Sequence, residues 1–156
     1  MIKKYRLLFA SLVITLGMGF LGSLAMPDLN GWYVELIKPA LQPPNWIFGP
    51  VWTVLYIFMG IALYRIWRLA HYRGDASLWT LVFLLHLVLN GAWSVLFFYF
   101  QNPSSALIDI AILWILLVYL LVRGWWIDRT AGWLLLPYVM WVTFATYLNL
   151  GIVLLN

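Results

Sequence analysis

Long apolar runs that carry almost no charge are the feature that most limits what this chain can fold into. About 20 apolar residues in an α-helix cross the hydrocarbon core of a bilayer, and the sequence contains five runs of that kind. The runs do not alternate between polar and apolar residues, which favours helices over the strands of a membrane barrel. The sequence therefore predicts an all-α, polytopic membrane protein, a five transmembrane helix bundle that forms a single domain, residues 1–156. The expected helices cover residues 5–26, 46–70, 77–101, 104–124 and 130–154, and the expected N-caps of the third and fourth are Ser77 and Ser104.

The composition excludes several functional classes. Charged residues make up 9% of the chain, against about 25% in soluble domains. There is no cysteine, which excludes disulfides and thiolate metal sites. The basic residues lie among aromatics at the ends of the runs, which is typical of contact with membrane lipid and predicts no nucleic-acid partner. Because the phosphate-binding, nucleophile-elbow and metalloprotease motifs are absent, we expect no metal, no required cofactor and no firmly assigned catalytic residue.

Charge predicts the orientation in the membrane. Five spans place the N-terminus and the turns at 71–76 and 125–130 on one side, together with every basic residue except Lys38. By the positive-inside rule the N-terminus is cytoplasmic and the loop at 27–45 faces outward. We therefore expect a bacterial inner membrane.

The first apolar run has two alternative interpretations. A signal peptide is one, but its apolar stretch is usually about 7–15 residues long, shorter than this run, which favours a retained helix. Ser11, Thr15, Gly19 and Ser23 form a row of small residues on that helix. Such a row lets two helices approach closely, either within the monomer or at a dimer seam.

The segment between the first two runs is rich in proline and tryptophan. Residues 32–52, WYVELIKPALQPPNWIFGPVW, include Pro39, Pro43, Pro44 and Pro50 and three tryptophans. A helix interior does not tolerate so many prolines, and a flexible linker has no need of large aromatics. We therefore expect an ordered loop at 27–45 that folds over something.

Four tryptophans, Trp52, Trp93, Trp114 and Trp141, lie deeper than an interfacial belt requires. From the helical rise, Trp52 lies ~10 Å, Trp93 ~12 Å and Trp141 ~20 Å below the outer ends of their helices. At helical spacing each shares a face with polar or small residues, which is typical of an inward face. Such faces suit a pocket for a flat, largely apolar ligand or a packed aromatic core without a cavity.

Polar residues at membrane depth need partners, because leaving them unpaired is costly there. Asn90 either ties down a neighbouring helix or contacts a ligand. His86 is either a haem ligand or, as we favour, a neutral, hydrogen-bonded core histidine. Asp109 has the chemistry to bind a cation or to carry a proton, but a hydrogen bond to loop or helix backbone is the expectation. Asn149 is expected to tie the bundle together.

Short motifs occur in order along essentially the whole chain. They are Trp32-Tyr33, Lys38-Pro39, Pro43-Pro44, Pro50-Val51-Trp52, Leu55-Tyr56, Asn90-Gly91-Ala92-Trp93, Phe97-Phe98 and the run from Pro137 to Asn149. Jointly they resemble the TspO/MBR family of tryptophan-rich sensory proteins, which includes the mitochondrial translocator protein (peripheral benzodiazepine receptor). The chain looks like a bacterial-type member.

The resemblance implies a pocket under the first loop that binds porphyrin, haem or another flat lipophilic ligand. By motif position, the implied ligand contacts are Trp52, Tyr56, Asn90, Trp93, Trp141, Ala145 and Leu148, and Gly22 and Ser23 match a small-residue wall. The implied lid loop contains Trp32, Lys38, Pro39, Pro43 and Pro44.

The same resemblance implies a homodimer that senses or regulates tetrapyrrole or stress status. Transport of porphyrins or small lipophilic molecules is the alternative. Light-dependent porphyrin degradation is another, for which Trp52 and Trp141 would be the matching indoles. By family analogy, an outer-membrane location is also open.

Overall fold

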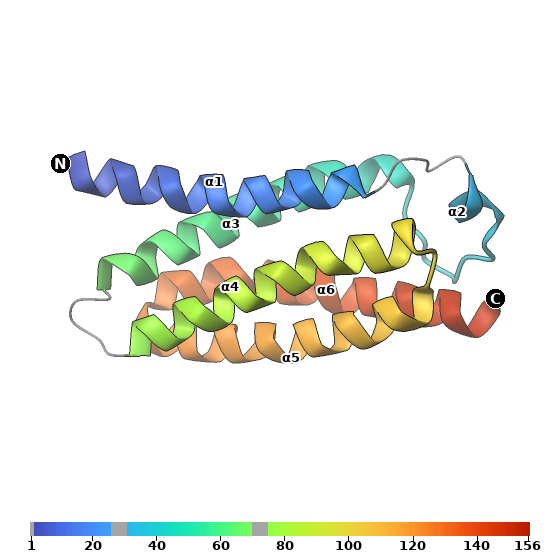
Figure 1. Ribbon diagram of the computed structural model, residues 1–156. Coiled ribbons are helices and arrows are strands. Elements are labelled where there is room, and N and C mark those ends of the chain that lie inside the picture. Colours follow the sequence, from blue (N-terminus) through green and yellow to red (C-terminus); the bar gives the residue numbers. More distant parts are fainter. Residues whose placement is uncertain (1, 26–30, 70–74) are drawn as a thin grey trace.

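Five long helices run side by side in an elongated bundle (Figure 1), and the computed structural model describes residues 2–25, 31–69 and 75–156. The long helices are α1 (Ile2–Leu24), α3 (Phe48–Leu69), α4 (Asp75–Ser94), α5 (Pro103–Ile127) and α6 (Arg129–Leu155). The short helix α2 (Trp32–Glu35) and the 3-10 turn η1 (Asn45–Ile47) precede α3, and the π-helical segment η2 (Val95–Tyr99) follows α4. Within these described ranges, five helical segments are long and apolar enough to cross a membrane. The prediction of an all-α, five-helix membrane bundle is confirmed.

The expected helix boundaries differ from the observed ones by a few residues, and the two N-cap predictions are wrong. Helix α4 begins at Asp75, so Ser77 lies inside its first turn, where the acidic residue at the start suits the helix dipole. Helix α5 is capped by Asn102, whose Oδ1 accepts a hydrogen bond from the Ser105 N–H at 2.9 Å. Pro103 follows at the first helical position, where its missing N–H is not needed. The predicted turn at 71–76 and the start of the predicted loop at 27–45 fall largely outside the described residues.

The helices form a ring in which each packs against two main neighbours. Their order around the ring is α1, α3, α6, α5 and α4, and α4 returns to α1. Helices α1 and α3 lie close together at Gly60, where a Cβ would lie 2.8 Å from Leu12 Cδ2 and from Thr15 Oγ1. Ser11 and Thr15 are fully buried. Part of the small-residue row on α1 therefore serves packing within the monomer.

The end of the bundle away from α2 is tightly packed. Trp79 and Phe83 stack with ring centroids 5.1 Å apart, and both are fully buried. The Trp79 indole N–H donates to the carbonyl of Leu120 at 2.9 Å, which satisfies its polar atom inside the bundle. The deep aromatics predicted either a ligand pocket or a packed aromatic core, and this half of the bundle has the packed core.

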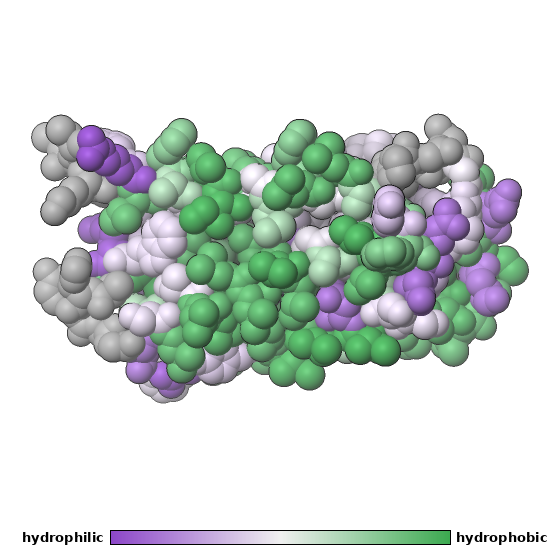
Figure 2. Space-filling model, viewed as in Figure 1, coloured by the Kyte–Doolittle hydropathy of each residue, from purple (hydrophilic) through white to green (hydrophobic). Residues whose placement is uncertain are grey.

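Charge and hydropathy divide the surface into zones. On the face shown in Figure 2, apolar side chains cover the middle of the bundle, and hydrophilic residues gather toward its two ends. At the end away from α2, Arg65 pairs with Asp128 at 2.9 Å and Arg123 pairs with Asp75 at 2.5 Å. This distribution fits a multi-pass integral membrane protein.

Candidate ligand-binding cavity

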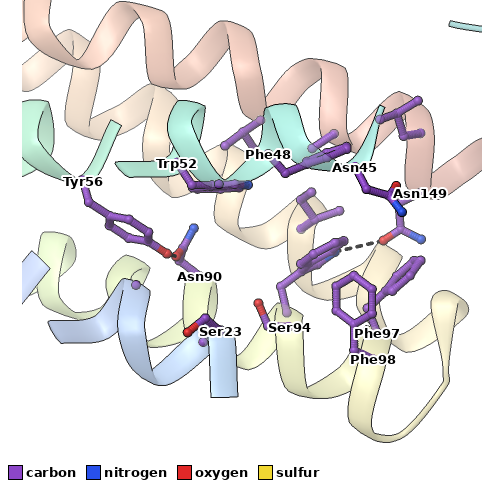
Figure 3. A pocket seen from close by; sticks show the side chains of 18 of the residues that line it. Ser23, Asn45, Phe48, Trp52, Tyr56, Asn90, Ser94, Phe97, Phe98 and Asn149 are labelled. Carbon is purple, nitrogen blue, oxygen red and sulfur yellow. Dashed lines mark hydrogen bonds between the residues drawn. The ribbon is translucent and has the colours of Figure 1, made fainter. Parts of the chain in front are cut away.

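A cavity of about 610 Å³ opens among the helices at the end that carries α2. Ligand pockets usually have volumes of roughly 300–1,000 Å³. All five long helices line the cavity, and so do the loop before α3 and the segment η2. Figure 3 shows side chains from α1, α3, α4, η2 and α6 facing this space. The ring order places the cavity on the inside of the bundle.

Eight of the nine residues predicted to contact a ligand line this cavity. They are Gly22, Ser23, Trp52, Tyr56, Asn90, Trp93, Ala145 and Leu148. The fold thus brings predicted residues from α3, α4 and α6 and the small-residue wall of α1 together around one cavity.

Trp141 is the ninth and does not line the cavity. It lines a separate, almost wholly apolar groove between α3 and α6, together with Pro50, Phe58 and Pro137. Its indole packs edge-on against Phe48, with ring centroids 5.8 Å apart. Trp141 shares a helix face with Ala145, but its long side chain turns toward Phe48 at the start of α3, a direction that neither helical spacing nor motif position indicates.

The predicted lid residues lie in the loop but do not line the cavity. Two of them pack against neighbouring helical segments. Trp32 packs edge-on against Phe97 at a centroid distance of 5.9 Å. Pro39 is buried against Gly151, where a Cβ would lie 2.5 Å from the proline Cβ. The parts of the loop that line the cavity are Tyr33, Gln42, Asn45 and Trp46. These were not predicted, although Tyr33 lies within one of the quoted motifs.

Hydrogen bonds fasten the lid, which comprises residues 31–45, to the C-terminal part of α6. The backbone N–H of Ile37 donates to Asn156 Oδ1 at 2.9 Å, and Asn156 Nδ2 donates to the Ile37 carbonyl at 3.1 Å. The Tyr147 hydroxyl donates to the carbonyl of Ala40 at 2.8 Å. The lid is therefore held by side chains on one helix that contact its backbone.

Tyr33 joins the lid to the cavity wall. Its ring packs against Phe97 and Phe98, with centroid distances of 6.2 and 5.6 Å. Lys38 Nζ lies 4.5 Å from the ring centroid, and Gln42 Nε2 donates to the hydroxyl at 3.0 Å. Burial raises the pKa of Tyr33, and the hydrogen bond from Gln42 offsets only part of this shift. The hydroxyl is therefore neutral at physiological pH and presents a hydrogen-bonding group to the cavity.

A chain of hydrogen bonds leads from the cavity floor into the packed half of the bundle. The Tyr56 hydroxyl donates to Asn90 Oδ1, and Asn90 Nδ2 donates to the Tyr138 hydroxyl at 2.9 Å. His86 Nε2 lies 2.9 Å from the same hydroxyl, and His86 Nδ1 lies 3.2 Å from the carbonyl of Phe83. Both ring nitrogens of His86 are engaged, which agrees with the core-histidine interpretation and not with a haem ligand.

Asn149 links three helices, as expected. Its Oδ1 accepts a hydrogen bond from the Trp93 indole N–H at 3.0 Å, and its Nδ2 donates to the Pro103 carbonyl at 2.9 Å. The first of these bonds is drawn in Figure 3. Asp109 differs from the expectation, because its buried Oδ2 has no hydrogen-bond partner in the described part of the chain.

Comparison with known proteins places the chain in a family. Residues 10–155 match the sequence model of the TspO/MBR family. This chain belongs to the TspO/MBR family. The resemblance inferred from the proline and tryptophan motifs is thereby confirmed.

Relatives from distant organisms align over nearly the full length of this TspO/MBR chain. It is 41% identical over 150 residues to the tryptophan-rich protein TspO of Archaeoglobus fulgidus, which covers 96% of each chain. It is 40% identical over 144 residues to the tryptophan-rich protein TspO of Chlorobaculum tepidum, covering 92% of this chain and 91% of the relative. It is 34% identical over 135 residues to the tryptophan-rich sensory protein of Cereibacter sphaeroides, covering 86% of this chain and 82% of the relative.

Proposed function

We propose that this TspO/MBR protein binds a tetrapyrrole, a porphyrin or a haem-related ligand, in the cavity under the lid, and that it acts as a membrane sensor or regulator. The observation that supports the proposal best is a 610 Å³ cavity in which Trp52 and Trp93 contribute to facing walls. A flat conjugated ligand gains most from such walls, because aromatic rings bury a large area and stack favourably.

The aromatic walls are held in place before any ligand arrives. The Trp93 ring stacks on Phe97 with centroids 5.0 Å apart, and Asn149 accepts its indole N–H. Trp52 contacts the Tyr56 ring at a centroid distance of 5.6 Å. Side chains that are already ordered lose little entropy when a ligand binds, which favours affinity.

Polar groups at the two ends of the cavity suit a ligand with an apolar body and polar edges. Tyr56 and Asn90 lie at the floor, while Gln42 and Asn45 line the side nearer the lid. Lys38 Nζ lies above the ring of Tyr33, so its charge is available to attract ligand carboxylates to the lid. We expect propionate groups to face the lid and the ring body to lie between the tryptophans.

A sensor is favoured over a carrier by the anchoring of the lid. Three hydrogen bonds tie the backbone of Ile37 and Ala40 to α6. A fastened lid suits retention of a ligand more than rapid passage. The name of the Cereibacter sphaeroides relative, a tryptophan-rich sensory protein, supports the same choice.

The test is a titration of the purified protein with protoporphyrin IX in darkness. Binding is monitored by tryptophan quenching and by porphyrin absorbance. We expect saturable binding that Trp52→Phe weakens by about tenfold, the equivalent of losing roughly 1.4 kcal/mol of aromatic contact. Trp141→Phe is the matched control, because it makes the same chemical change in the groove outside the cavity. Binding that does not saturate, or equal losses in both variants, would overturn the proposal.

Two further measurements separate the alternatives. Illumination that destroys more than one porphyrin per protein would indicate a degradative activity in place of sensing. Saturable porphyrin flux across proteoliposomes would indicate a carrier.

A further inference from the structure

We propose that His86, which does not line the cavity, determines the hydrogen-bonding character of its floor: it makes Tyr56 an acceptor and so selects ligands that present a donor N–H or O–H there. The inference rests on the proposed function and specifies the ligand chemistry of the same site. His86 would be a positioning residue, acting through Tyr138, Asn90 and Tyr56.

The carbonyl of Phe83 fixes the tautomer of His86. A carbonyl oxygen only accepts hydrogen bonds, so His86 Nδ1, 3.2 Å away, carries the hydrogen. His86 is fully buried in the membrane-spanning part of the bundle, where a charged side chain is costly. A neutral imidazole has a single ring N–H, so Nε2 is a bare acceptor.

The acceptor at Nε2 then sets the direction of every bond in the chain. Tyr138 gives its only hydroxyl hydrogen to His86 Nε2, 2.9 Å away. The Tyr138 oxygen must therefore accept from its other partner, which requires Asn90 to present Nδ2, as observed at 2.9 Å. The amide oxygen of Asn90 is thereby turned toward Tyr56, whose hydroxyl donates to it.

The consequence appears at the cavity surface. Tyr56 lines the cavity, and its hydroxyl hydrogen is already used by Asn90. The remaining lone pairs of the Tyr56 oxygen accept hydrogen bonds but do not donate them. A ligand N–H or O–H can donate a hydrogen bond to the Tyr56 oxygen. A ligand carbonyl at the same place is repelled, because both oxygens carry lone pairs and neither offers a hydrogen.

Removing the acceptor at position 86 should reverse the chain. In His86→Leu, Tyr138 loses the acceptor for its hydrogen. Rotation of the Asn90 amide restores one, because Oδ1 then faces Tyr138 and Nδ2 faces Tyr56. Tyr56 would accept from Asn90 and turn its own hydrogen to the cavity, so that the floor would match a ligand carbonyl.

Three flat tricyclic probes of similar shape test this prediction. Carbazole presents a donor N–H at its central ring, 9-fluorenone presents an acceptor carbonyl there, and fluorene presents neither. Dissociation constants of the purified full chain are measured for all three by tryptophan quenching. In the wild type we expect carbazole to bind about tenfold more tightly than 9-fluorenone, a ratio equivalent to one matched hydrogen bond.

The variants separate a directional role from a merely structural one. His86→Leu is expected to abolish or invert the carbazole preference, and His86→Gln, which places an amide oxygen near the position of Nε2, is expected to restore it. Tyr56→Phe should abolish the preference in every background. Equal losses of affinity for all three probes in His86→Leu, with an unchanged ratio, would overturn the proposal. Failure of the wild type to bind protoporphyrin IX would overturn the proposed function, whereas saturable porphyrin binding without a preference for carbazole would overturn only the role of His86, so the two failures are distinguishable.

A measurement without substitution at position 86 covers the case in which His86→Leu does not fold. The chain has two histidines, so His71→Gln leaves only the signals of His86. Nitrogen-15 NMR of this variant should show a neutral imidazole protonated at Nδ1. A hydrogen at Nε2 would overturn the proposal.

Discussion

Asn156 exchanges two hydrogen bonds with the backbone of Ile37, one in each direction, across 119 positions of sequence. A single amide side chain thus replaces the partner that a neighbouring strand would supply to this extended part of the lid. The position of the lid over the cavity therefore depends on the last turn of α6.

Asn156→Ala should loosen the lid. It removes both bonds to Ile37, each worth roughly 1 kcal/mol, and we expect protoporphyrin IX to dissociate about tenfold faster. Stopped-flow measurement of porphyrin release tests this expectation. Leu154→Ala is the control, since that side chain is exposed on the same turn. An unchanged release rate in Asn156→Ala would contradict the idea that this contact governs the lid.

Gly151→Ala should displace the lid by steric contact. A Cβ at this position would lie 2.5 Å from Pro39 Cβ and 2.8 Å from its Cγ, and a proline ring has little freedom to yield. We expect a loss of about 1–3 kcal/mol in stability, typical of overpacking, together with weaker porphyrin binding. Thermal melting in detergent measures the first effect.

Gly17→Ala provides the comparison, because a Cβ there meets nothing within 4 Å. In a helix, alanine is more favourable than glycine by roughly 1 kcal/mol, so Gly17→Ala should hold or raise the melting temperature. Equal melting temperatures in the two variants would argue against contact between Pro39 and Gly151.

Asp128 should make stability depend on pH in acid. Burial disfavours its charge, but hydrogen bonds from Arg65 and from the Ala131 N–H outweigh this and hold the pKa of Asp128 below its ordinary value. Its contribution is therefore fully present above the ordinary aspartate pKa of about 3.9 and is lost as pH falls through the lower folded value. Thermal melting between about pH 2 and pH 7 should show this loss.

Asp128→Asn keeps an oxygen to cap α6 but removes the charge, so it should flatten that acid dependence. Asp75→Asn is the matched control, because Asp75 is 62% exposed in its pair with Arg123 and exposed pairs contribute little. A melting profile in which Asp75→Asn has the larger effect would contradict the assignment.

The orientation of the chain is open to direct labelling. The protein contains no cysteine, so single cysteines report without background. Leu41→Cys lies on the exposed lid and Thr130→Cys is exposed at the other end of the bundle. With the predicted outward lid, a membrane-impermeant maleimide should label Leu41→Cys in intact spheroplasts and Thr130→Cys only after lysis. The reverse pattern would show that the positive-inside argument fails for this chain.

Local features of the sequence predicted the helices and their inward faces, and the family resemblance supplied most of the residues that line the cavity. Run length determined the spans, and four-residue spacing on α3 and α4 brought Trp52, Tyr56 and Asn90 to one space. The direction of a long side chain is less accessible to such reasoning. Trp141 has the right helix face, but its indole extends toward Phe48 and away from the cavity.

Contacts between distant parts of the chain were the features that spacing did not predict. Nothing in the sequence near Ile37 indicates that Asn156 will bind its backbone. The direction of the chain from His86 to Tyr56 depends on the carbonyl of Phe83, whose position follows from the folded helix. Each of these features requires the positions of two or more packed helices at once.

The lid joins an early part of the chain to a late one, and this has a consequence for biogenesis. Residues 31–45 emerge from the ribosome soon after α1, but the partners of Ile37, Pro39 and Ala40 all lie on α6. During synthesis the lid lacks these three contacts while α3, α4 and α5 enter the membrane. The cavity thus lacks both its α6 wall and the α6 anchors of its lid until α6 is inserted, and a hydrophobic ligand or a lipid chain has access to the nascent protein throughout that interval.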